Sequence, residues 1–141
     1  MKTTKKIEND FMYKGFRCVV VGLYLGHRCG YLGIPSSHKL YGKSLGDAGI
    51  AVHGGWTLEE YSDSFSPVDV YESVWWCGFD CGHACDCNDL DLIKELNNEK
   101  DAKLLCSVAE LTQHNGIVRT TKYVEDELVD AVDQIVNMFV Y

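Results

Sequence analysis

The pattern of apolar residues changes once along this chain, near residue 88. Before that point, short runs of aromatic and β-branched residues are interrupted by glycines, which is typical of strands joined by turns. We expect a surface loop at 59–67 and strands at 16–25, 29–34, 50–53 and 68–79. After it, apolar residues recur every three or four positions, which predicts helices. Strands first and helices after predict an α+β fold, with a mostly antiparallel sheet in the N-terminal half packed by C-terminal helices.

The last expected helix has the most regular apolar stripe. It runs from Lys122 to Phe139 and places these apolar residues on one side: Val124, Leu128, Ala131, Val132, Ile135, Val136 and Phe139. Two helices precede it, one capped by Asn88 or Asp89 and one capped by Asp101. In the Asp101 helix we expect the apolar face to consist of Leu104, Leu105, Val108 and Leu111.

Length and composition fit one globular domain. A chain of 141 residues falls in the usual range for a single domain, and we expect residues 1–10 to form a flexible N-terminus and 11–141 one α+β domain. No apolar run approaches the roughly 20 residues that cross a bilayer, and no secretory signal is visible. We therefore expect a cytoplasmic protein without a membrane partner, in which the seven cysteines stay reduced.

Charge is unevenly distributed along the chain. Residues 1–45 carry eight lysines and arginines against two acidic residues, whereas the whole chain has a net charge of −8. The acidic remainder would repel a polyanion, so we expect no nucleic-acid polymer as partner. A small anion that touches only the basic first third is compatible with this pattern, and so is a solvated acidic surface beside a lysine-bearing tail.

Two stretches carry residues suited to binding chemistry. Residues 75–87 read WWCGFDCGHACDC, and residues 53–56 read HGGW. Aromatic side chains beside glycines and titratable groups suit a surface where a flat ligand stacks and polar groups converge on it. We expect both stretches to fold into one concave site, although they are far apart in the chain.

The polar groups of the two stretches have distinct expected roles. Gly54 and Gly55 would offer backbone N–H groups to a phosphate or carboxylate, because no Cβ blocks the approach. His53 and His83 would contact phosphate or ribose, and Asp80 would orient a histidine or bind a hydroxyl. For the glycines, a tight turn is the structural alternative.

Indole rings and neighbouring groups would complete the expected site. Trp56 or Trp75 would stack on a base. If this stretch is a strand, Trp75 and Trp76 point to opposite faces, so one is expected in the core and the other free for contact. Lys43 would supply a compensating positive charge. Cys81 lies within the same cluster, with a packed thiol as its structural alternative.

The cysteines also allow a metal site. Cys81, His83, Cys85 and Cys87 are zinc-ligand types, and in an extended chain all four could point to one face. Their spacing differs from the C-x2-C pairs of zinc knuckles, and one short strand cannot easily surround an ion. We therefore expect no cofactor and keep a divalent metal ion as the alternative.

Two other functions could use the same residues. A hydrolase could act on a phosphate- or ribose-containing small molecule through His53, Asp80 and His83, with or without a divalent ion. Residue types alone do not make a catalytic site, and the sequence has no nucleophile elbow, H-E-x-x-H motif or phosphate-binding loop. A protein-binding inhibitor of a host factor could instead use exposed tryptophans as its hot spot. We favour binding over catalysis.

These residues give the chain a resemblance to a family of small, mostly uncharacterised proteins encoded by bacteriophages and prophages. The family pattern is His-Gly-Gly, an apolar residue and threonine, then Trp-Trp-x-Gly-Phe-Asp-Cys-x-His-x-x-Asp. Residues 53–57 and 75–86 match it here. Cys85 and Cys87 depart from it, which weakens the metal alternative.

The resemblance implies a viral protein in the cytoplasm of an infected bacterial host. Small phage proteins of this kind often counter bacterial immunity, and several sequester or cleave nucleotide-derived signals. By that analogy we expect the chain to bind and sequester a small polar, nucleotide-derived immune signal. The sequence allows a homo-oligomer but does not determine the oligomeric state.

Overall fold

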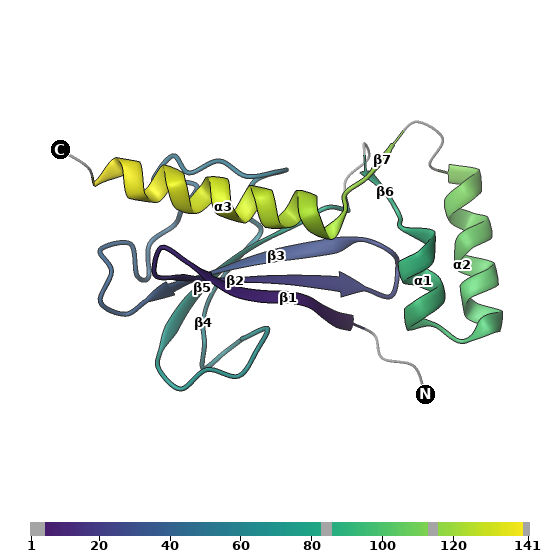
Figure 1. The fold of residues 1–141 in the computed structure, drawn as a ribbon, viewed down its shortest axis with the longest axis horizontal. Coiled ribbons are helices and arrows are strands. Elements are labelled where there is room, and N and C mark those ends of the chain that lie inside the picture. Colours follow the sequence, from purple (N-terminus) through teal and green to yellow (C-terminus); the bar gives the residue numbers. More distant parts are fainter. Residues whose placement is uncertain (1–4, 83–85, 113–115, 140–141) are drawn as a thin grey trace.

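A five-stranded antiparallel sheet forms the centre of the molecule, with the strand order β1-β2-β3-β5-β4 (Figure 1). The computed structural model describes residues 5–82, 86–112 and 116–139. The strands are β1 Lys5–Tyr13, β2 Phe16–Leu23, β3 Arg28–Pro35, β4 Leu58–Tyr61 and β5 Val74–Asp80. With the helices that follow, this sheet confirms the predicted α+β fold.

Three helices accompany the sheet. The long helix α3 (Thr121–Met138) lies across one face, and α1 (Leu90–Leu96) and α2 (Glu99–Thr112) form a pair beyond one end of the sheet (Figure 1). Between them and α3, β6 (Asp86–Cys87) pairs in parallel with β7 (Ile117–Val118). Within the described parts of the chain, no helix combines the length and apolarity needed to span a bilayer.

The edge strands of the sheet differ from the prediction. β1 begins at Lys5 and pairs with β2, so residues 5–10 belong to the sheet rather than to a flexible N-terminus. β4 lies in the segment predicted to be a loop, and its two adjacent glutamates suit an edge strand that must not pair further. Residues 50–53 form no strand, because Ala51 and His53 donate their N–H groups to side chains of α3.

The predicted stripe of α3 packs on the sheet. Its buried residues are Val124, Leu128, Ala131, Val132 and Ile135, in agreement with the predicted spacing. The opposite face of the sheet carries Val19, Val21 and Trp76. The connection between β4 and β5 covers that face with Val68 and Val70, so the predicted strand at 68–79 is shortened to β5.

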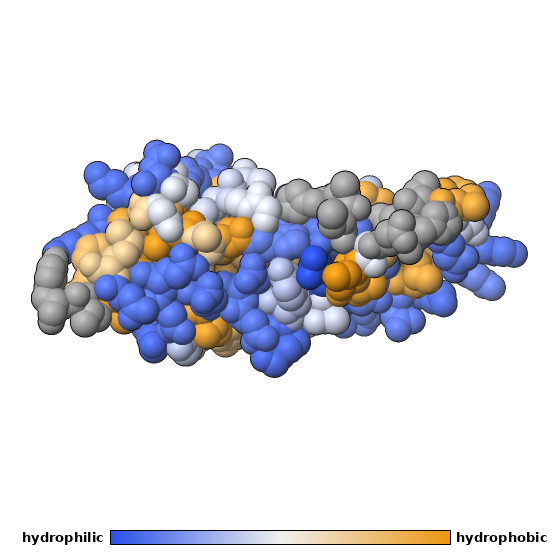
Figure 2. Space-filling model, turned by 90° about the horizontal axis from the view of Figure 1, so that it is seen from above, coloured by the Kyte–Doolittle hydropathy of each residue, from blue (hydrophilic) through white to orange (hydrophobic). Residues whose placement is uncertain are grey.

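Helix α2 turns most of its predicted apolar face outward. Ala102, Cys106 and Ala109 are buried, whereas Leu104, Val108 and Leu111 are exposed, so the expected face is not the packed one. Figure 2 shows hydrophobic residues on the surface at this end of the molecule. The small residues let α2 approach Ile93 of α1 closely, and the larger side chains consequently face away from it.

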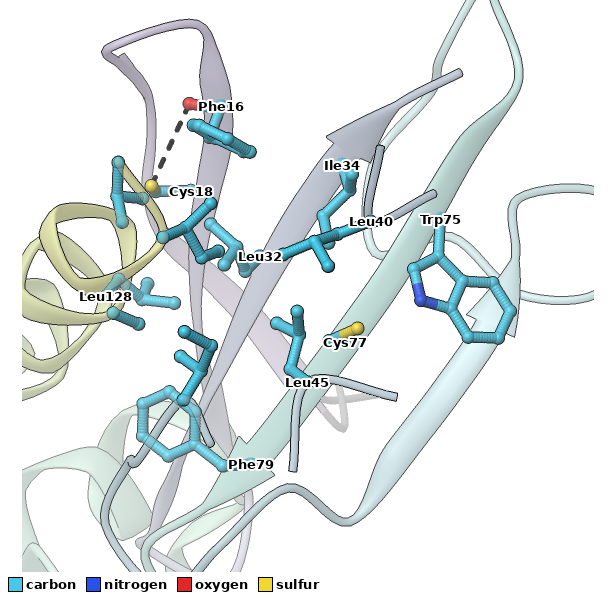
Figure 3. Packing of buried hydrophobic residues seen from close by; sticks show 14 of the residues in the cluster. Phe16, Cys18, Leu32, Ile34, Leu40, Leu45, Trp75, Cys77, Phe79 and Leu128 are labelled. Atoms are coloured by element: carbon cyan, nitrogen blue, oxygen red, sulfur yellow. Dashed lines mark hydrogen bonds between the residues drawn. The ribbon is translucent and has the colours of Figure 1, made fainter. Parts of the chain in front are cut away.

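The main core lies between the sheet and α3. Figure 3 shows Leu128 of α3 directed toward Leu32 of β3, and Phe79 of β5 belongs to the same cluster. Leu40 and Leu45, in the loop after β3, extend this cluster over the sheet. The loop that follows, which contains the His-Gly-Gly stretch, is therefore placed on the α3 side of the molecule.

Candidate functional site

The His-Gly-Gly stretch forms a tight turn after Val52. The Gly55 N–H donates to the Val52 carbonyl oxygen at 3.0 Å. Gly54 and Gly55 have φ angles of 69° and 82°, in the left-handed region that residues with a Cβ rarely adopt. The turn itself requires the two glycines, and the Gly55 N–H is bonded within the turn rather than offered to a ligand.

Helix α3 fixes this loop through its side chains. Glu127 accepts a hydrogen bond from the His53 backbone N–H at 2.7 Å. Two helical turns later, Gln134 accepts from the Ala51 N–H at 2.8 Å and donates to the Ala51 carbonyl oxygen at 2.9 Å. These bonds satisfy backbone groups that no strand pairs. They also set the position of the His53 side chain relative to α3.

Both ring nitrogens of His53 have partners. Nε2 lies 2.9 Å from Asp86 Oδ2, and Nδ1 lies 2.9 Å from the Tyr123 hydroxyl. An ionised carboxylate only accepts hydrogen bonds, so Nε2 donates to Asp86 and a neutral ring accepts from Tyr123 at Nδ1. Burial, with the Glu127 carboxylate nearby, raises the pKa of the Tyr123 phenol. The phenol therefore stays protonated and able to donate.

Asp86 is the buried centre of the site. Its side chain is 1% exposed, and its second oxygen, Oδ1, accepts from Arg119 Nε at 2.9 Å. The short parallel pairing of β6 with β7 places Asp86 opposite Ile117, two residues before Arg119. A buried carboxylate is costly unless charged or polar donors compensate it. We call the four side chains joined here, His53, Asp86, Arg119 and Tyr123, the Asp86 network.

Arg119 is the solvent-facing cation of the Asp86 network. Its side chain is 20% exposed, and its guanidinium carbon lies 4.7 Å from the centre of the Tyr123 ring. The hydrogen bond to Asp86 raises the pKa of Arg119, which is charged at any physiological pH. In the part of the chain that the structure describes, its two terminal amino groups have no hydrogen-bond partner.

Asp80 and Cys81, predicted beside His53, lie on opposite sides of the sheet. Asp80 stands opposite Cys29 of β3 and accepts the Gly82 N–H at 3.0 Å. Cys81 belongs to the core cluster on the α3 side, and strand residues alternate between faces. The aspartate that meets His53 is thus Asp86 and not Asp80. Burial raises the pKa of the Cys81 thiol to about 12, so it is a packed, unreactive thiol at neutral pH.

The tryptophans are packed into the protein. Trp75 and Trp76 are both buried, on opposite faces of the sheet, and Trp75 Nε1 donates to the Lys43 carbonyl oxygen at 2.8 Å. Trp56 is half-buried, with its ring edge-on to Phe79. The expectation that Trp75 or Trp76 is free for contact is wrong, because covering segments close both faces. These two residues therefore provide neither a stacking wall nor an exposed hot spot.

The remaining predicted residues contribute less to this geometry. The Lys43 side chain is exposed, and Cys87 is half-buried beside the Asp86 network. His83 and Cys85 lie outside the described residues. Across 5–82, 86–112 and 116–139, no group of three or more His, Cys, Asp or Glu side chains is placed to hold a metal ion. The metal alternative through Cys81, His83, Cys85 and Cys87 stays a prediction.

Sequence reasoning missed the two residues that complete the Asp86 network. Arg119 is the only arginine in residues 46–141, and Tyr123 follows it by four residues. An aromatic residue four positions after an arginine can lie under the guanidinium, which is the signal that could have identified the pair. The contact of Asp86 with His53 has no such local signal.

Comparison with known proteins identifies no relative of this chain. No protein-family model, curated protein or solved structure matches the chain. The function is therefore argued from the Asp86 network itself.

Proposed function

We propose that this chain binds a small phosphate-bearing ligand beside Arg119 and holds it without converting it. The observation that supports this most directly is the hydrogen bonding of the Arg119 guanidinium. Asp86 fixes Nε, while the terminal amino groups remain without a hydrogen-bond partner among the described residues. A guanidinium held in this way presents a planar pair of donors, which matches the oxygens of a phosphate.

The surroundings of Arg119 favour an anion. The negative charge of the network is buried at Asp86, whereas the arginine reaches the surface. Arg119 directly precedes the capping residue Thr120 of α3, and the first turn of a long helix favours negative charge. The Gly54–Gly55 turn follows His53, and both glycines are exposed, so no side chain of the turn fills the space in front of it.

The engagement of His53 favours binding over turnover. A general base needs a ring nitrogen within reach of a substrate proton, and both nitrogens of His53 are bonded inside the protein. The predicted hydrolase also needs Asp80, which lies on the other side of the sheet from Cys81 and α3. A cluster locked by mutual hydrogen bonds suits a rigid binding surface.

A second candidate function is favoured by one observation. The chain of contacts from Tyr123 through His53 to Asp86 has the order of a hydroxyl, an imidazole and a carboxylate, as in relays that activate a hydroxyl group. In this arrangement His53 would accept the proton of the Tyr123 hydroxyl, and the Tyr123 oxygen would attack a phosphorus atom of a ligand held by Arg119 and displace the alcohol of its ester. Product formation distinguishes this catalytic function from simple binding.

The nature of the ligand beyond its phosphate follows from the resemblance to phage proteins. A nucleotide-derived immune signal carries the phosphate that Arg119 suits, and sequestration requires binding without release of product. The proposed biological role is therefore counter-defence in an infected bacterium. A carboxylate metabolite offers the same fork-shaped acceptor and is the main competing ligand chemistry.

The test is a calorimetric titration of the full chain with ADP-ribose, a cyclic dinucleotide and adenosine. Adenosine matches the base and ribose of the first ligand but lacks phosphate. We expect binding of at least one phosphate-bearing compound and no binding of adenosine. Chromatography of the same mixtures after incubation should show unchanged ligand, whereas a new product would support the relay.

The proposal is overturned if neither phosphate-bearing compound nor inorganic pyrophosphate binds at millimolar concentration. Equal affinity for adenosine and ADP-ribose would also contradict it, because recognition would then not involve the phosphate.

A further inference from the structure

Three tyrosines and two carboxylates line one cleft at the β4 edge of the sheet. The loop after β3, the end of β4 and the connection from β4 to β5 build its walls. Its volume of about 470 Å3 falls in the range of small-molecule sites. We use the name tyrosine cleft for this space and for the residues that give it its chemistry, Tyr41, Tyr61, Asp63, Tyr71 and Glu72. None of them belongs to the Asp86 network.

Two of the three rings in the tyrosine cleft are held in place by their neighbours. The centre of the Tyr61 ring lies 4.6 Å from that of Trp75 and 5.4 Å from that of Tyr41. The Tyr41 hydroxyl is hydrogen-bonded to the Ser73 hydroxyl. Tyr71 is fully exposed, so its ring is available to a ligand. The cleft therefore combines two fixed rings with one that is free for contact.

The connection that carries Asp63, Tyr71 and Glu72 is anchored where it leaves the sheet. The Ser62 N–H donates to the Val74 carbonyl oxygen at 2.8 Å, and the Val74 N–H donates to Ser62 Oγ at 3.0 Å. These two bonds join the beginning and the end of the connection. Its backbone is therefore positioned before a ligand arrives, which lowers the entropic cost of binding.

The charge of the tyrosine cleft is negative and uncompensated. Asp63 and Glu72 are exposed, and within the described part of the chain neither carboxylate has a hydrogen-bond or ion-pair partner. No lysine, arginine or histidine among the described residues lines the cleft. Arg17 borders the adjoining groove with Tyr71 and Glu72, but its guanidinium donates to both carboxylate oxygens of Asp10. The cleft therefore disfavours a phosphate and favours a cation.

We propose that the tyrosine cleft binds the methylated ammonium group of a small organic cation. The faces of aromatic rings are negative and attract a cation, and quaternary ammonium ligands are recognised in this way. Methyl groups on the nitrogen also add apolar surface for the rings to cover, whereas a bare ammonium is strongly hydrated. The carboxylates of Asp63 and Glu72 add Coulombic attraction. This site is independent of the Asp86 network, for which we propose an anionic ligand.

The test is an amide NMR titration of the full chain with choline and with 3,3-dimethylbutan-1-ol. The alcohol is the uncharged isostere of choline, because a carbon atom replaces the nitrogen. With choline we expect saturable shifts that are largest at residues 61–63 and 71–73, and a dissociation constant of about 0.1–10 mM. The isostere has the same shape without the charge, so it should bind at least about fivefold more weakly.

Variants of exposed residues locate the cation. Tyr71→Ala and Glu72→Gln should each weaken choline binding at least about twofold, and the double variant at least about fourfold. Tyr24→Ala and Glu110→Gln are the matched controls, because they remove an exposed tyrosine and an exposed carboxylate outside the cleft. Both controls should bind choline as wild type does. The amide spectrum of each variant also confirms that the fold is retained.

Three outcomes would overturn the proposal. The first is the absence of a saturable shift with choline at about 50 mM, well above the expected dissociation constant. The second is an isostere that binds as tightly as choline, because the cleft then recognises shape rather than charge. The third is a double variant, Tyr71→Ala with Glu72→Gln, that binds choline as wild type does, because the cation then lies elsewhere.

Discussion

Asp86 Oδ2 lies 2.9 Å from His53 Nε2, and this contact joins the His-Gly-Gly turn to the end of the stretch 75–87. The carboxylate is buried, and its other oxygen holds Arg119. A single side chain thus links the loop after β3, the β6–β7 pair and the beginning of α3. The stability of the site and the position of its arginine both depend on Asp86.

Asp86→Ala should destabilise the protein strongly. The substitution leaves Arg119 and His53 without their shared acceptor, and breaking a buried ion pair from one side costs about 3–5 kcal/mol. Asp126→Ala removes the partner of Lys122 at an exposed pair and should change the free energy of unfolding by no more than about 0.5 kcal/mol. Urea denaturation of both variants measures the difference. Similar losses for the two would show that Asp86 is not structurally central.

Gly55→Ala should also be destabilising, for a reason that involves no contact. Its φ of 82° is in the left-handed region, where an L-residue costs about 1–2 kcal/mol, although space for a Cβ is open. Gly46→Ala is the matched control, since Gly46 has no positive φ and only Ser44 nearby. Thermal denaturation should show a clear loss for the first and almost none for the second. The reverse order would contradict the turn geometry.

Arg28→Lys tests the buried ion cluster that anchors β1 and α1. Arg28 pairs with Glu8 and Asp89 and donates to the Arg119 carbonyl oxygen. A lysine cannot make these bonds in one plane, so we expect a loss of about 2–3 kcal/mol. Arg17→Lys changes a more exposed pair with Asp10 and should cost less than about 1 kcal/mol. Chemical denaturation of both variants provides the comparison, and equal costs would argue against the cluster.

Stability should decrease in alkaline solution because of buried thiols. Burial raises the pKa of Cys18, Cys77 and Cys81 to about 12 and that of Cys29 to about 11, from an ordinary value of 9.0. The unfolded chain releases these protons first, so the stabilisation is complete below pH 9 and is lost as the pH rises toward 11–12. Each thiol contributes a slope of at most about 1.4 kcal/mol per pH unit.

The measurement is the free energy of unfolding in urea at pH 8, 9, 10 and 10.5. Cys77→Ala should reduce the slope above pH 9, because one of the four titrating thiols is absent from both states. A free energy that is constant or increases between pH 9 and 10.5 would show that these thiols are accessible in the folded protein.

The parts of the fold with strong local patterns are the parts that sequence reasoning predicts well. The apolar residues of α3 from Val124 to Ile135 lie on one side of the helix, and this side packs on the sheet. Helix α2 also has a helical apolar pattern, yet its large residues face outward, because the pattern itself does not say which face packs within the same chain. Strand β4, with Glu59 and Glu60, lacks the composition of a strand and is formed by its pairing with β5.

The candidate site was predictable in location more than in detail. The residues HGGW and WWCGFDCGHACDC indicated that two distant stretches matter, and His53 does meet a residue of the second stretch. Which aspartate it meets depends on the alternation of β5 and on the two-residue pairing of β6 with β7. The alternation follows from the predicted strand, but the β6–β7 pairing has no local sequence signal. The two buried tryptophans likewise depend on loops that cover each face.

Arg119, held by Asp86, is the residue that we propose binds the phosphate of a small ligand. The most direct test is the calorimetric affinity of wild type, Arg119→Lys and Lys122→Ala for ADP-ribose and for a cyclic dinucleotide. Arg119→Lys keeps the charge but loses the planar fork, so it should weaken binding at least tenfold, while Lys122→Ala, an exposed cation three residues away, should leave binding unchanged. Equal affinities for all three proteins would contradict the claim.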